Sequence, residues 1–480
     1  MKSPPRDGRN AWDAAGSTGG SVRIQSCGVF CGKGVQSASR FDVLGHFGDV
    51  LIEFKVSNFR SIREEQTFSL VAGNVDKDLS EPVIDRDLPG LSGVRFLKGA
   101  AIYGANASGK SNVIEAIRYL AEFVLRSATS IQPGDPTGAQ PFKLDRDSAR
   151  KPSEFEITFV AEGDRYVFGF SVTPDRVVEE YLVAYPKGVP QRWYHRTYNA
   201  ARGSYEWSKP STSFKQDKSL QGKTRENSLF LSVGPQFNHA QLTQVYGWFK
   251  RSLRFIHLSA DWMLHPLFTA EMVAKPTHRD RVLGLLRSAD VGVADAQVRE
   301  VEVSVDEFVQ NTPPALLARV GKEGLTHSPP KRVEIKLTHK ADGIEPVALD
   351  FETEESAGTR RFFSLIGPWT EILDHGYTVF VDEIETSLHP ILVKELLKLV
   401  LCNKTNPNGA QVVFTTHSPV LLDGSLMRRD QIWFTEKSPA GATQLYPLTD
   451  YQPRKDEALA KGYLAGRYGA IPFLPEGLKP

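Results

Sequence analysis

The stretch LKGAAIYGANASGKSNVIEAIRYL (residues 97–120) decides the fold. Small and apolar residues come first, a Gly-rich turn follows, and apolar residues then recur at helical spacing. The turn, GANASGKS (104–111), fits the pattern G-x-x-x-x-G-K-[ST], which is typical of a phosphate-binding loop between a strand and a helix. The alternative, a flexible Gly/Ser turn, does not require this context. The sequence therefore predicts a P-loop and an α/β fold.

The residue types in this loop can be explained by the requirements of phosphate binding. Gly104 and Gly109 let the backbone bend closely around phosphates, with successive N–H groups pointing inward. Lys110 would reach the β- and γ-phosphates and the Ser111 hydroxyl would bind Mg²⁺, while the following helix presents its amino terminus to the anion. The expected nucleotide-binding residues of the loop are Gly104, Asn106, Ser108, Gly109, Lys110 and Ser111.

A pair of carboxylates stands at the end of a second apolar run, in VFVDEIETSLHP (379–390). A phosphate-binding loop needs a carboxylate at a strand end to hold Mg²⁺, and often a base that orients the attacking water. Asp382 is the metal-side candidate and Glu383 the general-base candidate. The alternative is that the two acids only begin the next helix, because acidic residues suit a helix amino terminus.

Two further stretches carry candidate site residues. QVVFTTHSPVLLD (411–423) is a buried strand that ends in His417, which we interpret as a γ-phosphate sensor; the alternative is a core or helix-capping histidine. ESAGTRRFFSL (355–365) places Ser356 and Gly358 just before an apolar-periodic helix. Such a helix start is suited to an anion, but Ser356 can equally be a plain N-cap.

Composition sets the broad class. The chain has 480 residues, 40% of them hydrophobic and 24% charged, as in a globular protein that folds in water. The 58 basic and 57 acidic residues give a net charge of +1, which is no global sign of nucleic-acid binding, although a local basic groove stays compatible with it. No apolar run of about 18 residues predicts a membrane span. Three cysteines suggest a reducing compartment, and we expect a cytoplasmic protein.

The pattern along the chain divides it into four parts. Residues 1–49 lack hydrophobic periodicity and should form a disordered tail, so that Val50 is a hypothetical true start of translation. Residues 50–235 are expected to form an N-terminal lobe that holds the loop and, over 153–207, antiparallel strands. Residues 236–330 should be a mainly helical insertion, clearest at 278–303, and residues 331–480 a C-terminal α/β lobe. The C-terminal elements expected are strands 331–340 and 347–355, helix 359–374, strand 378–382, helix 390–402 and strand 411–416.

The order of the motifs resembles a known group of ATPases. A Walker A sequence (104–111) is followed by S-x-G-T-R-R (356–361), VDEIETSLHP (381–390) and TTHSP (415–419). This order is similar to that of ABC-type ATPases of the RecF/SMC/OLD-like branch, and in particular to stand-alone AAA-type-core ATPases of bacterial abortive-infection and restriction-linked loci. The resemblance covers about 50–475 and includes LIEFKVSNFRSI (51–62) and the segment 428–472.

The resemblance implies a fold and a set of roles. The fold would be a P-loop NTPase of ABC-ATPase type, with an antiparallel β subdomain and a helical insertion; no sustained heptads predict a long coiled coil. ATP and Mg²⁺ would be the ligands, with Asp382 on Mg²⁺, Glu383 activating water and His417 on the γ-phosphate. Arg60 would approach the nucleotide. Ser356 and Gly358 would contact ATP held by a second subunit, although SAGTR replaces the usual LSGGQ.

The same resemblance supplies less specific expectations. The D-loop equivalent would be Ser387–His389, and Gln140 is a weak candidate for the Q-loop, more simply read as a loop residue. One loop per chain predicts a homodimer or a higher homo-oligomer, without membrane contact. The DRD triplets at 85–87 and 145–147 read as solvated turns, and only 63 residues follow His417, so we expect no nuclease domain in this sequence.

Three functions stay open from the sequence. The first is an ATP-hydrolysing switch in anti-phage defence that controls a separate effector such as a nuclease. The second is a RecF-like DNA-repair clamp, in which RWYHRTY (192–198) would touch nucleic acid, unless it is an ordinary strand surface. The third is a nucleotide-binding scaffold with negligible hydrolysis, against which the presence of Lys110, Asp382 and Glu383 argues.

Overall fold

The computed structural model describes residues 29–30, 48–256, 265–289, 291–304, 331–340, 343, 345–386 and 388–472. The chain divides into two compact units, residues 1–40 with 299–334, and residues 41–298 with 335–480. In the first unit, β1 (Val29–Phe30) pairs antiparallel with the start of β14 (Lys331–His339). The expected disorder of 1–49 therefore does not hold for Val29–Phe30, because a partner strand takes up their backbone hydrogen bonds; most of that tail lies outside the described residues. Everything below concerns the second unit.

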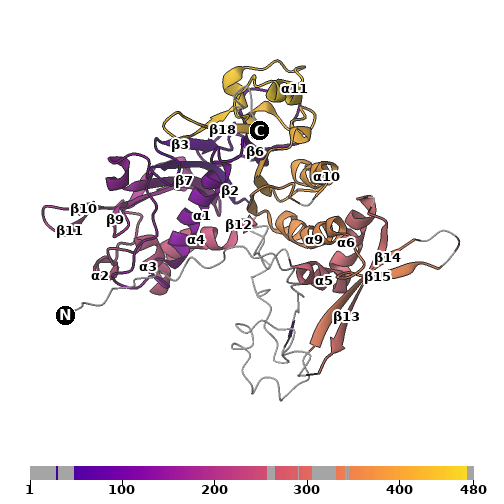
Figure 1. Cartoon of the computed structure of the whole chain (residues 1–480). Helices are drawn as coiled ribbons and strands as arrows, with labels where there is room; N and C mark the ends of the chain where they lie inside the picture. The colour runs from indigo at the N-terminus through magenta and orange to yellow at the C-terminus, as the bar shows by residue number, and fades with distance from the viewer. Residues whose placement is uncertain are drawn as a thin grey trace, which may run out of the picture. The chain divides into compact units, whose positions relative to one another are not determined.

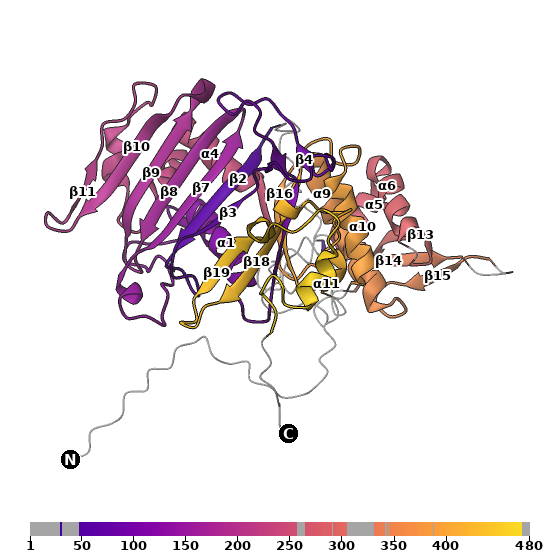
Figure 2. The ribbon, with the colours of Figure 1, turned by 90° about the horizontal axis from the view of Figure 1, so that it is seen from above.

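A six-stranded sheet organises this unit and is mixed in direction (Figures 1 and 2). Its first five strands are parallel, and only the last is antiparallel to its neighbour. In spatial order the strands are β12 (Leu253–Ile256), β16 (Thr378–Val381), β17 (Gln411–Thr416), β6 (Gly99–Gly104), β18 (Ile432–Lys437) and β19 (Thr443–Pro447). Strands β6, β16 and β17 are buried along their whole length, as expected for near-continuous apolar runs in a parallel sheet.

The register of this sheet brings three strand ends together. Tyr103 in β6 lies opposite Thr416 in β17, and Phe414 in β17 lies opposite Val381 in β16. The carboxyl ends of the three strands therefore meet at one edge of the sheet. Segments far apart in the sequence, from the expected N-terminal and C-terminal lobes, thus share one sheet.

Helix α1 (Lys110–Arg126) follows β6 and joins the sheet to the main core. Its buried residues recur at helical spacing, so that one face packs inward. Complete burial of an aliphatic side chain stabilises the fold by about 1.5–3 kcal/mol. The members of this face include Val113, Ile117, Leu120 and Val124.

A seven-stranded antiparallel sheet covers the other side of this core. Its strands alternate buried apolar and more exposed polar residues; β7, for example, buries Phe155, Ile157 and Phe159 and turns Glu154 and Glu156 outward. The expectation of antiparallel strands over 153–207 is confirmed. In spatial order the strands are β11 (Ser204–Trp207), β10 (Gln191–Asn199), β9 (Val177–Tyr185), β8 (Asp164–Val172), β7 (Ser153–Ala161), β2 (Val50–Ser57) and β3 (Gln66–Ser69).

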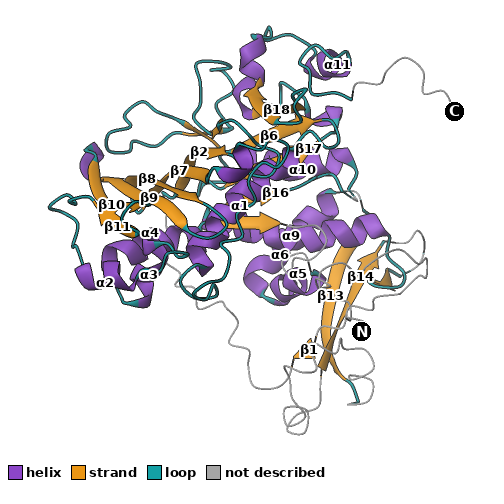
Figure 3. Ribbon diagram, turned by 60° about the vertical axis from the view of Figure 1, so that its left-hand side comes forward, coloured by secondary structure: helices purple, strands orange, loops and turns teal. Residues whose placement is uncertain are grey.

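The remaining helices surround these sheets. Helices α5 (Pro266–Ala274), α6 (Pro276–Ser288) and α9 (Ala357–His375) pack together, as Figure 3 shows. The others are α2 (Lys218–Lys223), α3 (Phe230–Gln236), α4 (Ala240–Arg251), α10 (Pro390–Leu401) and α11 (Leu459–Leu464). The short strands are β4 (Val83–Ile84), β5 (Phe96–Leu97) and β15 (Val347–Asp350), and the 3-10 turns near the site include η4 (Pro419–Leu421). In the ranges that the structure covers, no helix is long and apolar enough to cross a membrane.

One helix prediction is wrong in its second half. The helix expected over 278–303 ends at Ser288, and β13 (Val293–Glu302) follows it. Ala289 is the C-cap of this helix, Gly292 beyond it adopts a left-handed backbone with φ of +76°, and the valines that follow favour a strand. Residues 236–330, where a mainly helical insertion is expected, contain helices α4, α5 and α6 but also strand β12. Residues 305–330 lie outside the described ranges.

Candidate functional site

The loop between β6 and α1 leaves the sheet at the edge where the three strand ends meet. Its last residue, Gly109, is the N-cap of α1 and has a φ of +110°, and Ala107 is also left-handed, with φ of +64°. Within the described residues, no side chain caps α1, so the N–H groups of its first turn are left for another acceptor. An anion is the natural ligand for such a helix start.

The two glycines of the loop are required by the packing as well as by the bend. A Cβ atom at Gly104 would overlap the side chains of Ser108 and Thr435, and a Cβ atom at Gly109 would overlap Thr443. Ser108 belongs to the loop itself, whereas Thr435 and Thr443 come from β18 and β19, which no sequence motif connects with the loop.

A chain of hydrogen bonds fixes the loop from outside. The Thr443 hydroxyl donates to the Ser108 carbonyl at 2.9 Å, so it must accept from Ser61 Oγ, 2.8 Å away. Ser61 in turn accepts from Asn112 Nδ2 at 2.6 Å, and Ser108 Oγ lies 2.6 Å from Thr435 Oγ1. The loop is therefore held in shape before any ligand contacts it. No sequence pattern marks these partners.

Lys110 lies at the centre of the site. Its side chain is buried, and Nζ donates to the carbonyls of Gly104 at 2.9 Å and Ala105 at 3.1 Å. Burial holds the pKa of Lys110 below its ordinary value, and the charges of Glu383, Asp382 and the nearby Glu385 offset only part of this effect. The structure thus brings the loop lysine and the strand-end carboxylates into electrostatic range of each other.

Asp382 and Glu383 are held by the neighbouring strand. The hydroxyl of Thr415, which is fully buried in β17, donates to Asp382 Oδ1 at 2.5 Å and accepts from the Glu383 N–H at 2.7 Å. Glu383 has a φ of +51°, a conformation that is costly for a side chain of this kind and that concentrates at functional sites. Its side chain is exposed at the sheet edge. The two acids do not begin a helix, because the next helix, α10, starts only at Pro390.

His417 follows β17 directly and points out of the core. Its side chain is 53% exposed, and its N–H donates to Glu385 Oε1 at 2.9 Å. The alternative of a core or capping histidine is wrong, since the residue is neither buried nor an N-cap; Ser418 occupies the N-cap position of η4.

Arg60 lies against α1, close to the loop. Its Nη2 atom is 3.2 Å from Glu115 Oε2, and its backbone N–H donates to the Gln140 carbonyl at 2.7 Å. Arg60 is left-handed, with φ of +49°. The guanidinium is thus anchored to the helix that carries the P-loop, and the side chain of Gln140 is exposed.

Ser356 and Gly358 begin α9. Ser356 is its N-cap, with Oγ accepting from the Thr359 N–H at 3.1 Å, so the N-cap interpretation is confirmed. Across the described ranges, no hydrogen bond or ion pair is found between these two residues and loop 104–111. In the expected D-loop, Ser387 lies outside the described residues, and His389 is the N-cap of α10.

The donor set fits Mg²⁺ with a nucleotide. In the part of the chain that the structure describes, no group of three His, Cys, Asp or Glu side chains could hold a metal ion by itself. Mg²⁺ is usually held by one or two protein oxygens together with phosphates and waters. The exposed Ser111 hydroxyl and the Thr415-bound carboxylate of Asp382 supply oxygens of the kind that Mg²⁺ takes from a protein.

The segment RWYHRTY offers only part of the expected aromatic and basic surface. Trp193 and Tyr194 are buried in the core, and the fully buried Arg196 pairs with Glu180 at 2.9 Å. Trp193, Tyr194 and Arg196 are therefore not placed to contact nucleic acid, because the pairing register of β10 shifts between Arg192 and Tyr194 and turns consecutive residues inward. The other three residues named for this contact are exposed or half-buried, namely Arg192, His195 and Tyr198.

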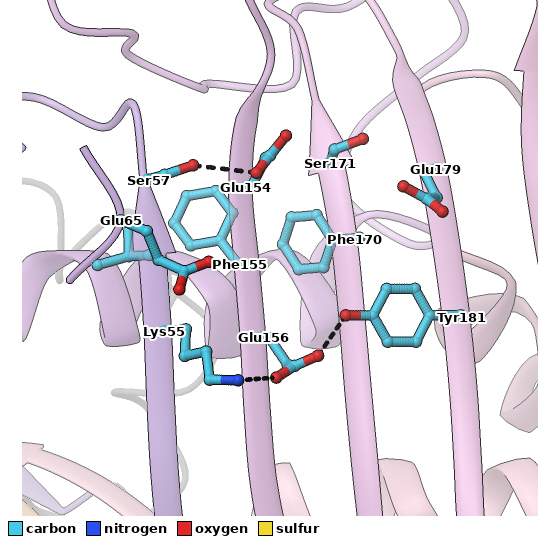
Figure 4. A pocket seen from close by; sticks show the side chains of 11 residues that line it. Lys55, Ser57, Glu65, Glu154, Phe155, Glu156, Phe170, Ser171, Glu179 and Tyr181 are labelled. Carbon is cyan, nitrogen blue, oxygen red and sulfur yellow. Dashed lines mark hydrogen bonds and ion pairs between the residues drawn. The ribbon is translucent and has the colours of Figure 1, made fainter. Parts of the chain in front are cut away.

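The outer face of the antiparallel sheet is hollowed and acidic (Figure 4). A hollow of about 190 Å³ opens there over β2, β7, β8 and β9. Glu156 accepts from Lys55 Nζ at 2.9 Å and from the Tyr181 hydroxyl at 2.5 Å. The charged residues that line it are Lys55, Glu65, Glu154, Glu156 and Glu179. An excess of carboxylates repels a phosphate backbone.

Comparison with known proteins finds one family and several structures. The model of the family described as "AAA domain, putative AbiEii toxin, Type IV TA system" matches residues 100–423. No curated protein matches the chain.

Among solved structures, the SMC head domain from Thermotoga maritima is 12% identical, with a TM-score of 0.34 over 83% of this chain and 98% of that chain. The Smc head domain from Pyrococcus furiosus, bound to the C-terminal domain of ScpA, is 11% identical, with a TM-score of 0.39 over 84% and 98%. The recombination mediator protein RecF with ATP is 13% identical, with a TM-score of 0.32 over 84% and 99%.

Proposed function

Since the chain belongs to the AbiEii-type family of AAA domains, we propose that it is a Mg²⁺-dependent ATPase that works as an ABC-type switch. The observation that carries the proposal is the strand register, which brings the end of β6 before the P-loop and the ends of β17 and β16 to one edge of the sheet, where the charges of Asp382 and Glu383 act on Lys110. A single magnesium–triphosphate group would join the loop to the strand end.

Different residues of the site would bind the phosphates, the Mg²⁺ ion and the rest of the nucleotide. The free N–H groups of the α1 start and the Lys110 ammonium would hold the phosphates, within a loop kept in shape by the Ser108 contacts. Ser111 and Asp382 would hold Mg²⁺, which neutralises phosphate charge when bound. Asn106 is exposed in the loop, and its backbone would contribute to the phosphate-binding site. Arg60, whose guanidinium pairs with Glu115 of α1, would contact the nucleotide.

Hydrolysis needs a base and a sensor at the same edge. Glu383 would accept a proton from the attacking water, for which its exposed side chain at the sheet edge is suited. His417, exposed at the end of the neighbouring strand, would contact the γ-phosphate. The scaffold alternative is weaker, since Glu383 has a strained backbone that a binding function alone does not require.

We further propose that two chains close around two ATP molecules, as a homodimer or within a higher oligomer. Ser356 and Gly358 of one chain would then contact ATP in the loop of the other. Of the described residues, a Cβ atom at Gly358 would meet only Ser356 Oγ within 4 Å, at 3.8 Å, so no contact with this part of the chain requires a glycine there. Close approach of an external group explains the absent side chain.

Replacing Gly358 with alanine should change the stability of the helix and the contact with the second chain in opposite directions. The helix gains about 0.5–1 kcal/mol because alanine suits a helix better than glycine, so thermal unfolding of the single chain should shift upward. ATP-dependent dimerisation, measured by light scattering, should be weakened. Gly284→Ala in α6 is the matched control, because its Cβ atom also meets open space and it should stabilise without changing dimerisation. Equal dimerisation of both variants would contradict the trans contact.

The biological role that we propose is anti-phage defence, in which the nucleotide state controls a separate effector such as a nuclease in the cytoplasm. Its support is the family description, which refers to a toxin of a toxin–antitoxin system. A RecF-like DNA clamp is the second candidate. It is less favoured, since Trp193 and Tyr194 of β10 are buried and the hollow on the outer face of the same sheet is acidic.

Phosphate release from ATP by the purified chain tests the proposal. We expect turnover with Mg²⁺ and none with excess EDTA. Binding without turnover would instead support the scaffold, and stimulation by duplex DNA would support the clamp. A chain that neither binds nor hydrolyses ATP would overturn the proposed function.

A further inference from the structure

Glu385 lies in the loop that leads from β16 towards α10, and the roles proposed above do not use it. Its side chain is only 12% exposed. Oε1 accepts from the His417 N–H at 2.9 Å and lies 3.5 Å from Nδ1 of the His417 ring. A carboxylate withdrawn from water costs free energy unless its oxygens are paired. Its retention beside the sensor histidine therefore needs an explanation.

The second oxygen of this carboxylate and a neighbouring hydroxyl are both buried. Among the residues that the structure describes, no hydrogen-bond partner is found for Oε2 of Glu385 or for the hydroxyl of the fully buried Tyr103, which directly precedes Gly104 of the P-loop. Burial, and then the charge of Glu385, raise the pKa of Tyr103 well above its ordinary value, so the two groups are in electrostatic range. Buried polar atoms without partners are rare, and each calls for a reason such as function.

We propose that Glu385 is a positioning residue for His417. Its carboxylate fixes the start of the loop after β17 through the His417 N–H, and it turns Nδ1 of the ring towards itself. The partner of one ring nitrogen decides the role of the other, so Nε2, on the opposite side of the ring, is left to meet the γ-phosphate. The inference rests on the proposed function, since it assumes that His417 contacts the nucleotide.

A purely structural role predicts a different outcome. To accept the His417 N–H, a neutral amide oxygen would serve as well as a carboxylate oxygen. Glu385→Gln keeps the shape and this acceptor but removes the charge that faces Nδ1. The variant therefore distinguishes a loop anchor from a residue that orients the imidazole.

The test is a double-mutant cycle on nucleotide affinity. A fluorescent non-hydrolysable ATP analogue and fluorescent ADP are titrated into wild type, Glu385→Gln, His417→Ala and the double variant. We expect Glu385→Gln to weaken the ATP analogue about five- to tenfold, because a charge-assisted contact is lost, with ADP affinity and melting temperature unchanged. It should have no further effect in the His417→Ala background. Glu385→Asp, which keeps the charge, should recover part of the preference for the ATP analogue.

Glu395→Gln is the matched control, since Glu395 lies on the surface of α10 and pairs with Lys398 at 2.6 Å. This variant should bind both nucleotides as the wild type does. The inference about Glu385 is overturned if Glu385→Gln binds the ATP analogue as tightly as the wild type does. It is also overturned if the variant loses the same affinity in the presence and in the absence of the His417 side chain. Neither outcome affects the proposed function. A wild type that binds neither nucleotide overturns the proposed function and this inference together.

Discussion

Replacing Lys110 with alanine is expected to abolish measurable ATP hydrolysis and to weaken ATP binding by about 30-fold or more, since truncating one partner of a desolvated charge pair costs about 2–5 kcal/mol. Lys110 is the cation of the loop, is buried, and feels the charges of Asp382 and Glu383. Without it, the triphosphate would lose the cation of the loop, and Mg²⁺ alone would offset less of the repulsion between the phosphates and those carboxylates. Titration with a fluorescent ATP analogue in the presence of Mg²⁺ measures the loss.

A control separates this effect from a change of folding. Lys110 also donates to the carbonyls of Gly104 and Ala105, so thermal unfolding of the variant must be followed in parallel. Lys398→Ala removes an exposed lysine that pairs with Glu395 and should leave ATP binding unchanged. A Lys110→Ala variant that folds and still binds ATP as tightly as the wild type would contradict the role of the loop.

Glu383→Gln should lower the rate of ATP hydrolysis by about 10²–10⁴-fold, the usual contribution of a general base. ATP binding should persist, because the main contacts of the phosphates are with the loop. The variant should therefore accumulate as an ATP-bound dimer, which light scattering detects as a doubled mass with ATP but not with ADP. The change is isosteric, so the hydrogen bond from the residue 383 N–H to Thr415 should remain.

Two outcomes would count against this prediction. Hydrolysis at the wild-type rate would remove Glu383 from the role of base. A variant that has lost hydrolysis, binds ATP and stays monomeric would refute the two-chain arrangement but leave the ATPase intact. Glu395→Gln again serves as the matched surface control.

The sequence was informative where the pattern is local. The glycines, lysine and serine of 104–111 lie in a single turn between a strand and a helix, so one motif predicts strand β6, the loop and α1 together. Apolar runs that end in Asp382 and His417 likewise predicted β16 and β17, because a buried parallel strand leaves polar residues only at its end.

The sequence was silent where the decisive contact is made in three dimensions. Thr415 holds both strand-end acids and Thr443 holds the loop, yet a threonine inside or at the start of a strand looks ordinary. Thr415 precedes His417 in the TTHSP motif, and this proximity was the only signal available. The shifted register of β10 was equally hidden, because alternation alone cannot show that Trp193 and Tyr194 both turn inward.

The central claim is that loop 104–111 and Asp382 share one magnesium–triphosphate group. The most direct test is the Mg²⁺ dependence of ATP affinity in wild type and in Asp382→Asn, measured from EDTA to saturating Mg²⁺ with a non-hydrolysable analogue. The account predicts that Mg²⁺ strengthens binding to the wild type, and that Asp382→Asn loses most of this gain while its affinity without Mg²⁺ is not reduced. An Asp382→Asn chain with the full Mg²⁺ dependence of the wild type would contradict it.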